Sequence, residues 1–150
     1  MSRRTPKRGF SKNRFNAYKH LSYASVSKIL YCIDKGRIDP AKPIEMKHLK
    51  EAGVCSKIIH GVKLTGRGVE QLRARNLALN LVVSECTKSV AETVQQLGGS
   101  VTLQYNTRLT LRAHLQPEKF ETLPRMPIPP PKRVLRLEKM RENLGICACE

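Results

Sequence analysis

The sequence predicts a small globular α/β domain of irregular strand–strand–helix turns, with an extended basic N-terminal arm and a Pro-rich C-terminal extension that ends in a helix. Three observations predict this architecture. The first 33 residues carry eight Lys or Arg side chains and no Asp or Glu. The middle of the chain alternates apolar strand-like segments with amphipathic helical ones. Residues 116–131 include six prolines, which gives a linker that cannot form a core. We therefore divide the chain into an arm at 1–22, a domain at 23–115 and an extension at 116–150.

The composition of the arm indicates a polyanionic partner. A folded core cannot absorb so many cations without an acidic side chain, because they would be desolvated or repel one another. A polyphosphate supplies the counter-charge, since each neutralised phosphate releases condensed counterions. Phe10, Phe15 and Tyr18 lie between the cations and can stack on unpaired bases, while Pro6 and Gly9 oppose helix formation. The alternative interpretation is a solvated tail whose aromatic side chains pack on the domain.

The first half of the domain is predicted to hold two helices. Ser25 suits the N-cap of a helix that reaches residue 33, and Gly36 suits the left-handed position just past its end. The segment 39–43 contains two prolines and forms a turn. A short helix over 44–52 follows, and Gly53 ends it.

The second half of the domain is predicted to alternate strands and one helix. Residues 54–64 are strand material broken at His60-Gly61, residues 65–68 form a turn, and the β-branched segment 77–83 is a buried strand. Thr87 can cap a helix over 88–97, which Gly98-Gly99 ends.

The end of the domain is predicted to be a hairpin. Residues 101–105 and 108–115 alternate apolar and polar side chains, as half-buried strands do, and Asn106-Thr107 would be the tight turn. Beyond the prolines, residues 132–143 can form a charged helix with too little apolar surface to fold alone. We expect this helix to pack either on another molecule or back onto the domain.

Charge and cysteine content exclude several classes of protein. A net charge of +16 on 150 residues exceeds the 2–8 units, roughly, that solubility requires. No run of 18 apolar residues occurs, and the arm has no amphipathic apolar face, so we expect no membrane partner. Five cysteines at scattered spacing do not describe a disulfide framework. We expect reduced, mostly buried thiols in a reducing compartment, and neither a metal nor another cofactor.

Catalytic motifs are missing from the sequence. It contains no Gly-x-Ser-x-Gly elbow, Walker loop or His-Glu-x-x-His. The glycine-bearing segment 61–68 lacks the terminal Lys-Ser/Thr of a phosphate cradle and is predicted to be a turn between strands. His60 and His114 are interpreted as structural or RNA-facing. We expect no catalytic residue, no small-molecule substrate and no enzymatic activity.

Several segments, in this order and spacing, resemble the universal fifteen family of large-subunit ribosomal proteins, ribosomal protein fifteen. Residues 3–10 resemble the family's RRLPKRGF, 51–54 its EAGV, 60–68 its DGVKLLGNG, and 87–101 its SASAKEAIEAAGGKV. Residues 31–40 look most like the mitochondrial branch. The resemblance covers roughly residues 3–105. Each segment alone is weakly specific, but their order and spacing together are strong.

The resemblance implies a structural constituent of the large ribosomal subunit, without catalytic activity, that serves translation as part of a ribonucleoprotein. It implies an arm that binds and bridges segments of large-subunit rRNA, neighbouring large-subunit proteins as partners, and a place in the mitoribosome of the mitochondrial matrix. The expected RNA contacts are, by family match, Arg3, Arg4, Lys7, Arg8, Gly9 and Phe10, by charge, Lys12, Arg14 and Lys19, and by stacking, Phe15 and Tyr18.

Other hypotheses stay open at this point. The chain could be a free-standing RNA-binding ribosome assembly factor, or an organellar enzyme or chaperone that uses the segment 61–68. Cytoplasm and plastid are the alternative locations. Because residues 3–10 belong to the mature family domain, we expect them not to be a cleaved transit peptide.

The sequence departs from the family pattern at both ends. The family's upstream Gly- and Arg/Lys-rich segment does not precede residue 3; it is lost, supplied by another chain or outside this sequence. We therefore expect a smaller RNA footprint than the family norm. Residues 116–150 do not match the bacterial pattern, and such extensions in mitochondrial members would contact neighbouring proteins or RNA.

Overall fold

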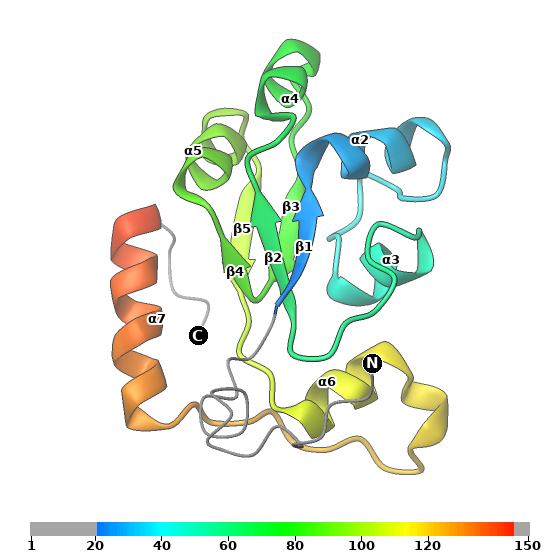
Figure 1. The fold of residues 1–150 in the computed structure, drawn as a ribbon, viewed down its shortest axis with the longest axis vertical. Helices are drawn as coiled ribbons and strands as arrows, with labels where there is room; N and C mark the ends of the chain where they lie inside the picture. The colour runs from blue at the N-terminus through cyan, green and yellow to red at the C-terminus, as the bar shows by residue number, and fades with distance from the viewer. Residues whose placement is uncertain (1–20, 146–150) are drawn as a thin grey trace, which may run out of the picture.

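Short parallel strands form the centre of the structure, a computed structural model that describes residues 21–145 (Figure 1). The described strands form a three-stranded sheet in the order β1-β2-β4 and a two-stranded sheet of β3 and β5. Their bounds are β1 Ser22–Ser25, β2 Val62–Thr65, β3 Asn80–Val83, β4 Glu85–Cys86 and β5 Ser100–Leu103. Every pairing between these strands is parallel, so each requires a crossover connection, usually a helix.

Helices supply the crossovers and surround the strands. The described helices are α2 Val26–Asp34, α3 Met46–Glu51, α4 Val69–Arg75, α5 Lys88–Gln96, α6 Arg108–Leu115 and α7 Pro131–Leu144, and a 3-10 turn spans Pro117–Lys119. In the view of Figure 1, α2 and α3 lie on one side of the strands, and α5 and α7 lie on the other. The helices α2 and α3 connect β1 to β2, α4 connects β2 to β3, and α5 leads to β5. This alternation confirms the predicted α/β class.

One hydrophobic core joins both sheets to the helices. Leu64 of β2, Val83 of β3, Leu72 of α4 and Val94 of α5 have no solvent exposure. A parallel bridge between Ile44 and Leu81 extends the smaller sheet at its edge. Because strands from both sheets contribute inward side chains to the same core, the small sheets stabilise each other through packing.

The helix boundaries in the first half follow the predicted stop and start signals. Ser25 has the extended backbone of an N-cap before α2, and Gly36 has a φ of 67° just past the end. The short helix α3 ends before Gly53, whose φ is 79°. Thr87 likewise precedes α5 with extended backbone. Glycine occupies both left-handed positions because it has no Cβ to clash.

The predicted hairpin at the end of the domain is wrong. Residues 108–115 form helix α6, and Thr107 is its N-cap instead of a turn residue. The Thr107 hydroxyl accepts a hydrogen bond from the Thr110 amide at 3.3 Å, and the Thr110 hydroxyl accepts one from the Thr107 amide at 2.8 Å. This reciprocal capping satisfies two backbone donors at the start of the helix. The strand β5 consequently pairs with β3, in parallel, and not with the segment that follows it.

Two further expectations need correction. The strand predicted over 54–64 is confined to β2, because the preceding residues form turns and bends that connect α3 to β2. The helix α4 follows the predicted turn at 65–68 and was not expected. Its only buried side chain, Leu72, contributes to the core, so tertiary packing, more than local apolar periodicity, stabilises this short helix.

The extension returns to the domain. Residues 121–130 have no helix or strand, as their prolines predict, and α7 then packs against α5. Leu144 is only 6% exposed, and Met140 packs against the core. The Gln95 side chain donates a hydrogen bond to the Gly145 carbonyl at 3.0 Å. Of the two expected docking partners for this helix, the domain is the one that the structure shows.

Candidate nucleic-acid interface

The site residues predicted from the sequence all precede the described part of the chain. They are Arg3, Arg4, Lys7, Arg8, Gly9, Phe10, Lys12, Arg14, Phe15, Tyr18 and Lys19, and they lie outside residues 21–145. Their contacts with RNA therefore stay a prediction. What the structure describes is the point at which the arm joins the domain, and the basic surfaces around it.

The root of the arm is fixed by β1. The Ser22 amide donates a hydrogen bond to the Gly61 carbonyl at 2.9 Å, and the Ser22 hydroxyl donates one to the Lys57 carbonyl. The four residues of β1 then pair with β2 in parallel, with Ser22 opposite Val62. Because an edge strand cannot shift its register without moving its buried side chain, Ala24, the arm leaves the domain at a defined place.

Gly61 permits this close approach. Its φ is 130°, and a Cβ at this position would lie 2.1 Å from Ser84 Oγ and 3.2 Å from Leu21 Cδ2. The strand β2, the residue before β4 and the root of the arm thus converge on one glycine. No other residue type fits both the backbone angle and the space.

A basic surface lies over α3 and α6, and we call it the α3–α6 face. It carries Lys50 from α3 and Arg108 and Arg112 from α6. Within the described chain, none of these three side chains has an acidic partner. Their charges are therefore available to a polyanion. Lys47 lies on the same helix as Lys50 but pairs with Glu51 at 3.9 Å.

A groove of about 340 Å³ runs between these cations. Its walls include all three cations, together with Ile59, which is 44% exposed, and the buried Leu111. Phosphate oxygens can meet the charged rim, and the apolar floor can accept a ribose or the face of a base. The groove therefore has the chemical character of an RNA-binding surface.

The sequence interpretation missed the α3–α6 face because it placed residues 108–115 in a strand. In a strand, Arg108 and Arg112 would be far apart along one face. In a helix they are four positions apart and adjacent. The signal that could have found them was the Thr107-x-x-Thr110 capping pattern, which predicts a helix start.

The segment 61–68 is occupied by the chain itself. A Cβ on Gly68 would lie 2.5 Å from the Ser27 backbone nitrogen at the start of α2, and the Ser27 amide donates to the Arg67 carbonyl at 2.9 Å. The close packing of this segment on α2 accounts for its glycines. The geometry gives no support to a nucleotide cradle, the basis of the enzyme hypothesis.

The described thiols are buried and free. Cys32, Cys55 and Cys86 form no disulfide, in line with the predicted reduced state. Burial raises the pKa of the Cys86 thiol to about 12, and burial also raises the pKa of the Cys55 thiol. Both therefore stay protonated at neutral pH, when they are poor nucleophiles and poor metal ligands.

The histidines and acidic residues suggest no separate chemistry. His114 Nε2 lies 3.7 Å from Glu45 Oε2, where α6 meets the start of α3. Over residues 21–145, no group of three or more His, Cys, Asp or Glu side chains could hold a metal ion. The same residues include no helix long and apolar enough to cross a membrane.

Comparison with known proteins gives the chain its relatives. It is 40% identical over 104 residues to "Large ribosomal subunit protein uL15m" of Schizosaccharomyces pombe, a match that covers 69% of this chain and 40% of that protein. It is 38% identical over 101 residues to uL15 of Beijerinckia indica, covering 67% of this chain and 58% of the relative. It is 30% identical over 117 residues to uL15m of Neurospora crassa, covering 77% and 36%.

These relatives are longer than the region they share with this chain. The chain spans between about two fifths and three fifths of their length. Residues 24–102 match the family described as ribosomal proteins 50S-L15 and 50S-L18e and their 60S counterpart. This range runs from β1 through β5 and includes the described α/β core. The chain therefore belongs to this family of ribosomal proteins.

Proposed function

We propose that this protein is a structural constituent of the large subunit of the mitochondrial ribosome, where it binds large-subunit rRNA through its arm and its α3–α6 face. The observation that carries the proposal is the match of residues 24–102 to a family of ribosomal proteins. The relatives reported above are named as large-subunit proteins, and none of those three is named as an assembly factor.

The mitochondrial location is supported by two of these relatives. The proteins of S. pombe and N. crassa carry the suffix m in the name uL15m, which designates mitochondrial members. The sequence of residues 31–40 also resembles that branch. The buried, free thiols at Cys32, Cys55 and Cys86 fit a reducing compartment such as the matrix.

The mechanism is electrostatic and geometric. The arm places eleven predicted contacts along an RNA groove and neutralises phosphates that would otherwise repel one another. The domain holds the root of the arm at Gly61 and presents Lys50, Arg108 and Arg112 from a second surface. A protein with two basic surfaces at a fixed separation can bridge two RNA segments, because each segment is bound where the other cannot reach.

Sedimentation with ribosomal particles tests this function. Tagged protein expressed in mitochondria should co-migrate with the mature large subunit in low and high salt. An assembly factor would instead appear mainly with precursors, and that result would overturn the proposal. An enzyme would bind a nucleotide or a metabolite in isolation, which we do not expect.

The salt dependence of RNA binding tests the arm. Changing Arg3, Arg4, Lys7 and Arg8 together to Ala should lower the salt slope of binding to large-subunit rRNA by up to about four. A matched control changes four exposed cations elsewhere, K42A/R75A/K88A/K139A, and removes the same net charge. If both variants keep the wild-type slope, the arm is not part of the interface.

A further inference from the structure

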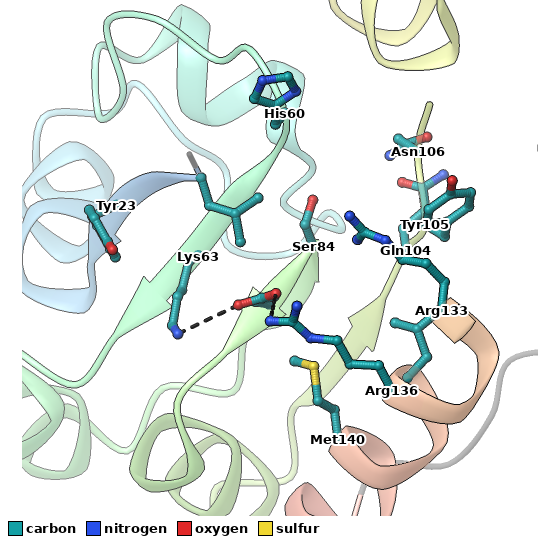
Figure 2. A pocket seen from close by; sticks show the side chains of 13 residues that line it. Tyr23, His60, Lys63, Ser84, Gln104, Tyr105, Asn106, Arg133, Arg136 and Met140 are labelled. Carbon is teal, nitrogen blue, oxygen red and sulfur yellow. Dashed lines mark hydrogen bonds and ion pairs between the residues drawn. The ribbon is translucent and has the colours of Figure 1, made fainter. Parts of the chain in front are cut away.

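A second groove lies where the extension meets the domain, and the proposed function does not yet use it. This groove, of about 390 Å³, separates α7 from the ends of β2 and β5. Figure 2 shows Gln104, Tyr105 and Asn106 on the chain after β5, with Arg133 and Arg136 approaching from α7. The root of the arm, Leu21, also lines it. We call this site the α7 groove.

A flat cationic platform forms one wall of the α7 groove. The Arg133 guanidinium lies over the Tyr105 ring, 5.7 Å from the ring centroid. Guanidinium and phenol planes are the surfaces on which proteins stack unpaired bases of RNA. The platform exists because α7 folds back, since its two components are 28 positions apart in the sequence and come from different elements.

Two buried amide atoms beside this platform have no hydrogen-bond partner among the described residues. They are Gln104 Oε1, an acceptor, and Asn106 Nδ2, a donor. Folded proteins rarely leave such atoms unpaired unless a ligand or water meets them. The same two side chains also line a cavity of about 300 Å³ on the side of α6 and the linker. One acceptor and one donor together match the edge of an RNA base, because every base carries both kinds of group.

The charge of the α7 groove favours an anion. The Glu85 carboxylate is shared by Lys63 at 3.5 Å and Arg136 at 3.1 Å (Figure 2). Arg133 has no acidic partner within the described chain. Three cations therefore face one carboxylate, and the net charge of the lining is positive. A phosphate beside Arg133 would be attracted, whereas a cationic peptide would be repelled.

We propose that the α7 groove binds one unpaired nucleotide of RNA, with its base stacked on the Arg133–Tyr105 pair and its base edge hydrogen-bonded to Gln104 and Asn106. This inference rests on the proposed function, which places the protein among RNA strands. It adds a specific ligand and a site outside both the arm and the α3–α6 face. The extension then has a role of its own, because α7 supplies one half of the binding site.

Photocrosslinking of the full chain tests the proposal directly. The probe is a single-stranded oligouridylate that contains one 4-thiouridine, irradiated with the purified protein and analysed by mass spectrometry. We expect a crosslink at Tyr105 or its immediate neighbours. Y105L should remove this crosslink and weaken binding of the probe about tenfold, whereas Y105F, which keeps the flat ring, should retain both.

Neutral substitutions separate the base contacts from charge. Q104A/N106A should weaken probe binding without changing its salt slope, because no phosphate contact is lost, while R133A should lower the slope by about one. The matched control is Y31L. Tyr31 also lies against a cation, Lys35, at 5.7 Å, but this pair is exposed on α2, and Y31L should bind the probe like the wild type.

The outcomes distinguish this proposal from the function on which it rests. If Y105L and Q104A/N106A fold normally and bind the probe as the wild type does, the α7 groove does not hold a nucleotide, even though the protein still sediments with the large subunit. If an acidic peptide protects the groove and RNA does not, the occupant is a protein and the proposal is wrong. If the protein does not associate with the large subunit at all, the proposed function fails first.

Discussion

The Arg136 guanidinium lies 3.1 Å from the Glu85 carboxylate, and this ion pair joins α7 to β4 across 51 positions of sequence. Glu85 is 14% exposed at its side chain, but Arg136 is 63% exposed. A pair so open to water contributes at most about 1 kcal/mol. The docking of α7 must therefore depend mainly on apolar contacts, above all those of Leu144, which is 6% exposed at the end of the helix.

Shortening this side chain should release the helix. We expect L144A to weaken the docking of α7 by about 2 kcal/mol, because a buried leucine loses its apolar contacts and leaves a cavity. Hydrogen exchange of the α7 amides and proteolysis within 121–130 should both accelerate. On the same helix L135A is the control, since Leu135 is 61% exposed. Equal protection in L144A and L135A would contradict the prediction.

Removing two charges from the α3–α6 face should weaken RNA binding. R108A/R112A is expected to lower the salt slope for large-subunit rRNA by about two, one for each lost phosphate contact. The measurement is a filter-binding or anisotropy titration over a range of salt concentrations. K42A/K88A removes the same net charge from residues that pair with Asp39 and Glu92, and it should leave the slope near that of the wild type. A full slope in R108A/R112A would exclude this face from the interface.

Gly61 should tolerate substitution far less well than Gly36. Both have positive φ, but a Cβ on Gly61 meets Ser84 Oγ at 2.1 Å, whereas nothing lies within 4 Å of one on Gly36. We expect G61A to lower the free energy of unfolding by about 3 kcal/mol, from strain plus overpacking, and G36A by about 1 kcal/mol. Urea unfolding of both variants measures the difference. Similar losses in the two would show that the close approach at the root of the arm is unimportant.

The Cys86 thiol should make stability depend on pH in the alkaline range. Burial raises its pKa to about 12 from 9.0, so the unfolded chain releases the proton before the folded protein does. Below pH 9 the thiol is protonated in both states and its ionisation does not affect the free energy of unfolding. Between pH 9 and 12 the free energy of unfolding falls by about 1.4 kcal/mol per pH unit from this group.

A variant without the thiol isolates this contribution from other alkaline titrations. Unfolding of the wild type and of C86A should be compared at pH 8 and pH 10. The wild type should lose more stability than C86A between the two, because only the wild type carries the buried thiol. An identical loss in both proteins would show that Cys86 ionises in the folded state as readily as in the unfolded one.

Local signals in the sequence were sufficient where side chain and backbone requirements agreed. Ser25, Gly36 and Thr87 mark helix ends by their own chemistry, and the structure places helix boundaries at each. The prolines of 116–131 likewise exclude regular structure before α7 over residues 121–130. These features depend on a few neighbouring residues, so the chain encodes them without reference to the rest of the fold.

The segment 108–115 shows where such signals conflict. Its alternation of apolar and polar side chains suits a strand, and its Thr107-x-x-Thr110 cap suits a helix. The helix prevails because β3 already pairs with β5 and because Leu111 and Ala113 become buried when α6 packs against α3. Leu109 is left 57% exposed as a consequence. Tertiary packing therefore overrode the periodicity.

The sequence by itself determined the class of the protein. An acid-free basic start, an α/β alternation and the ordered family segments are properties of the chain, and they predicted a ribosomal protein before any contact was known. Only the tertiary structure decided where its grooves lie. Arg108 joins Lys50, and Arg133 joins Tyr105, across long stretches of chain. Such pairs form because burying the apolar faces of α6 and α7 brings distant side chains together, and that packing depends on the whole core.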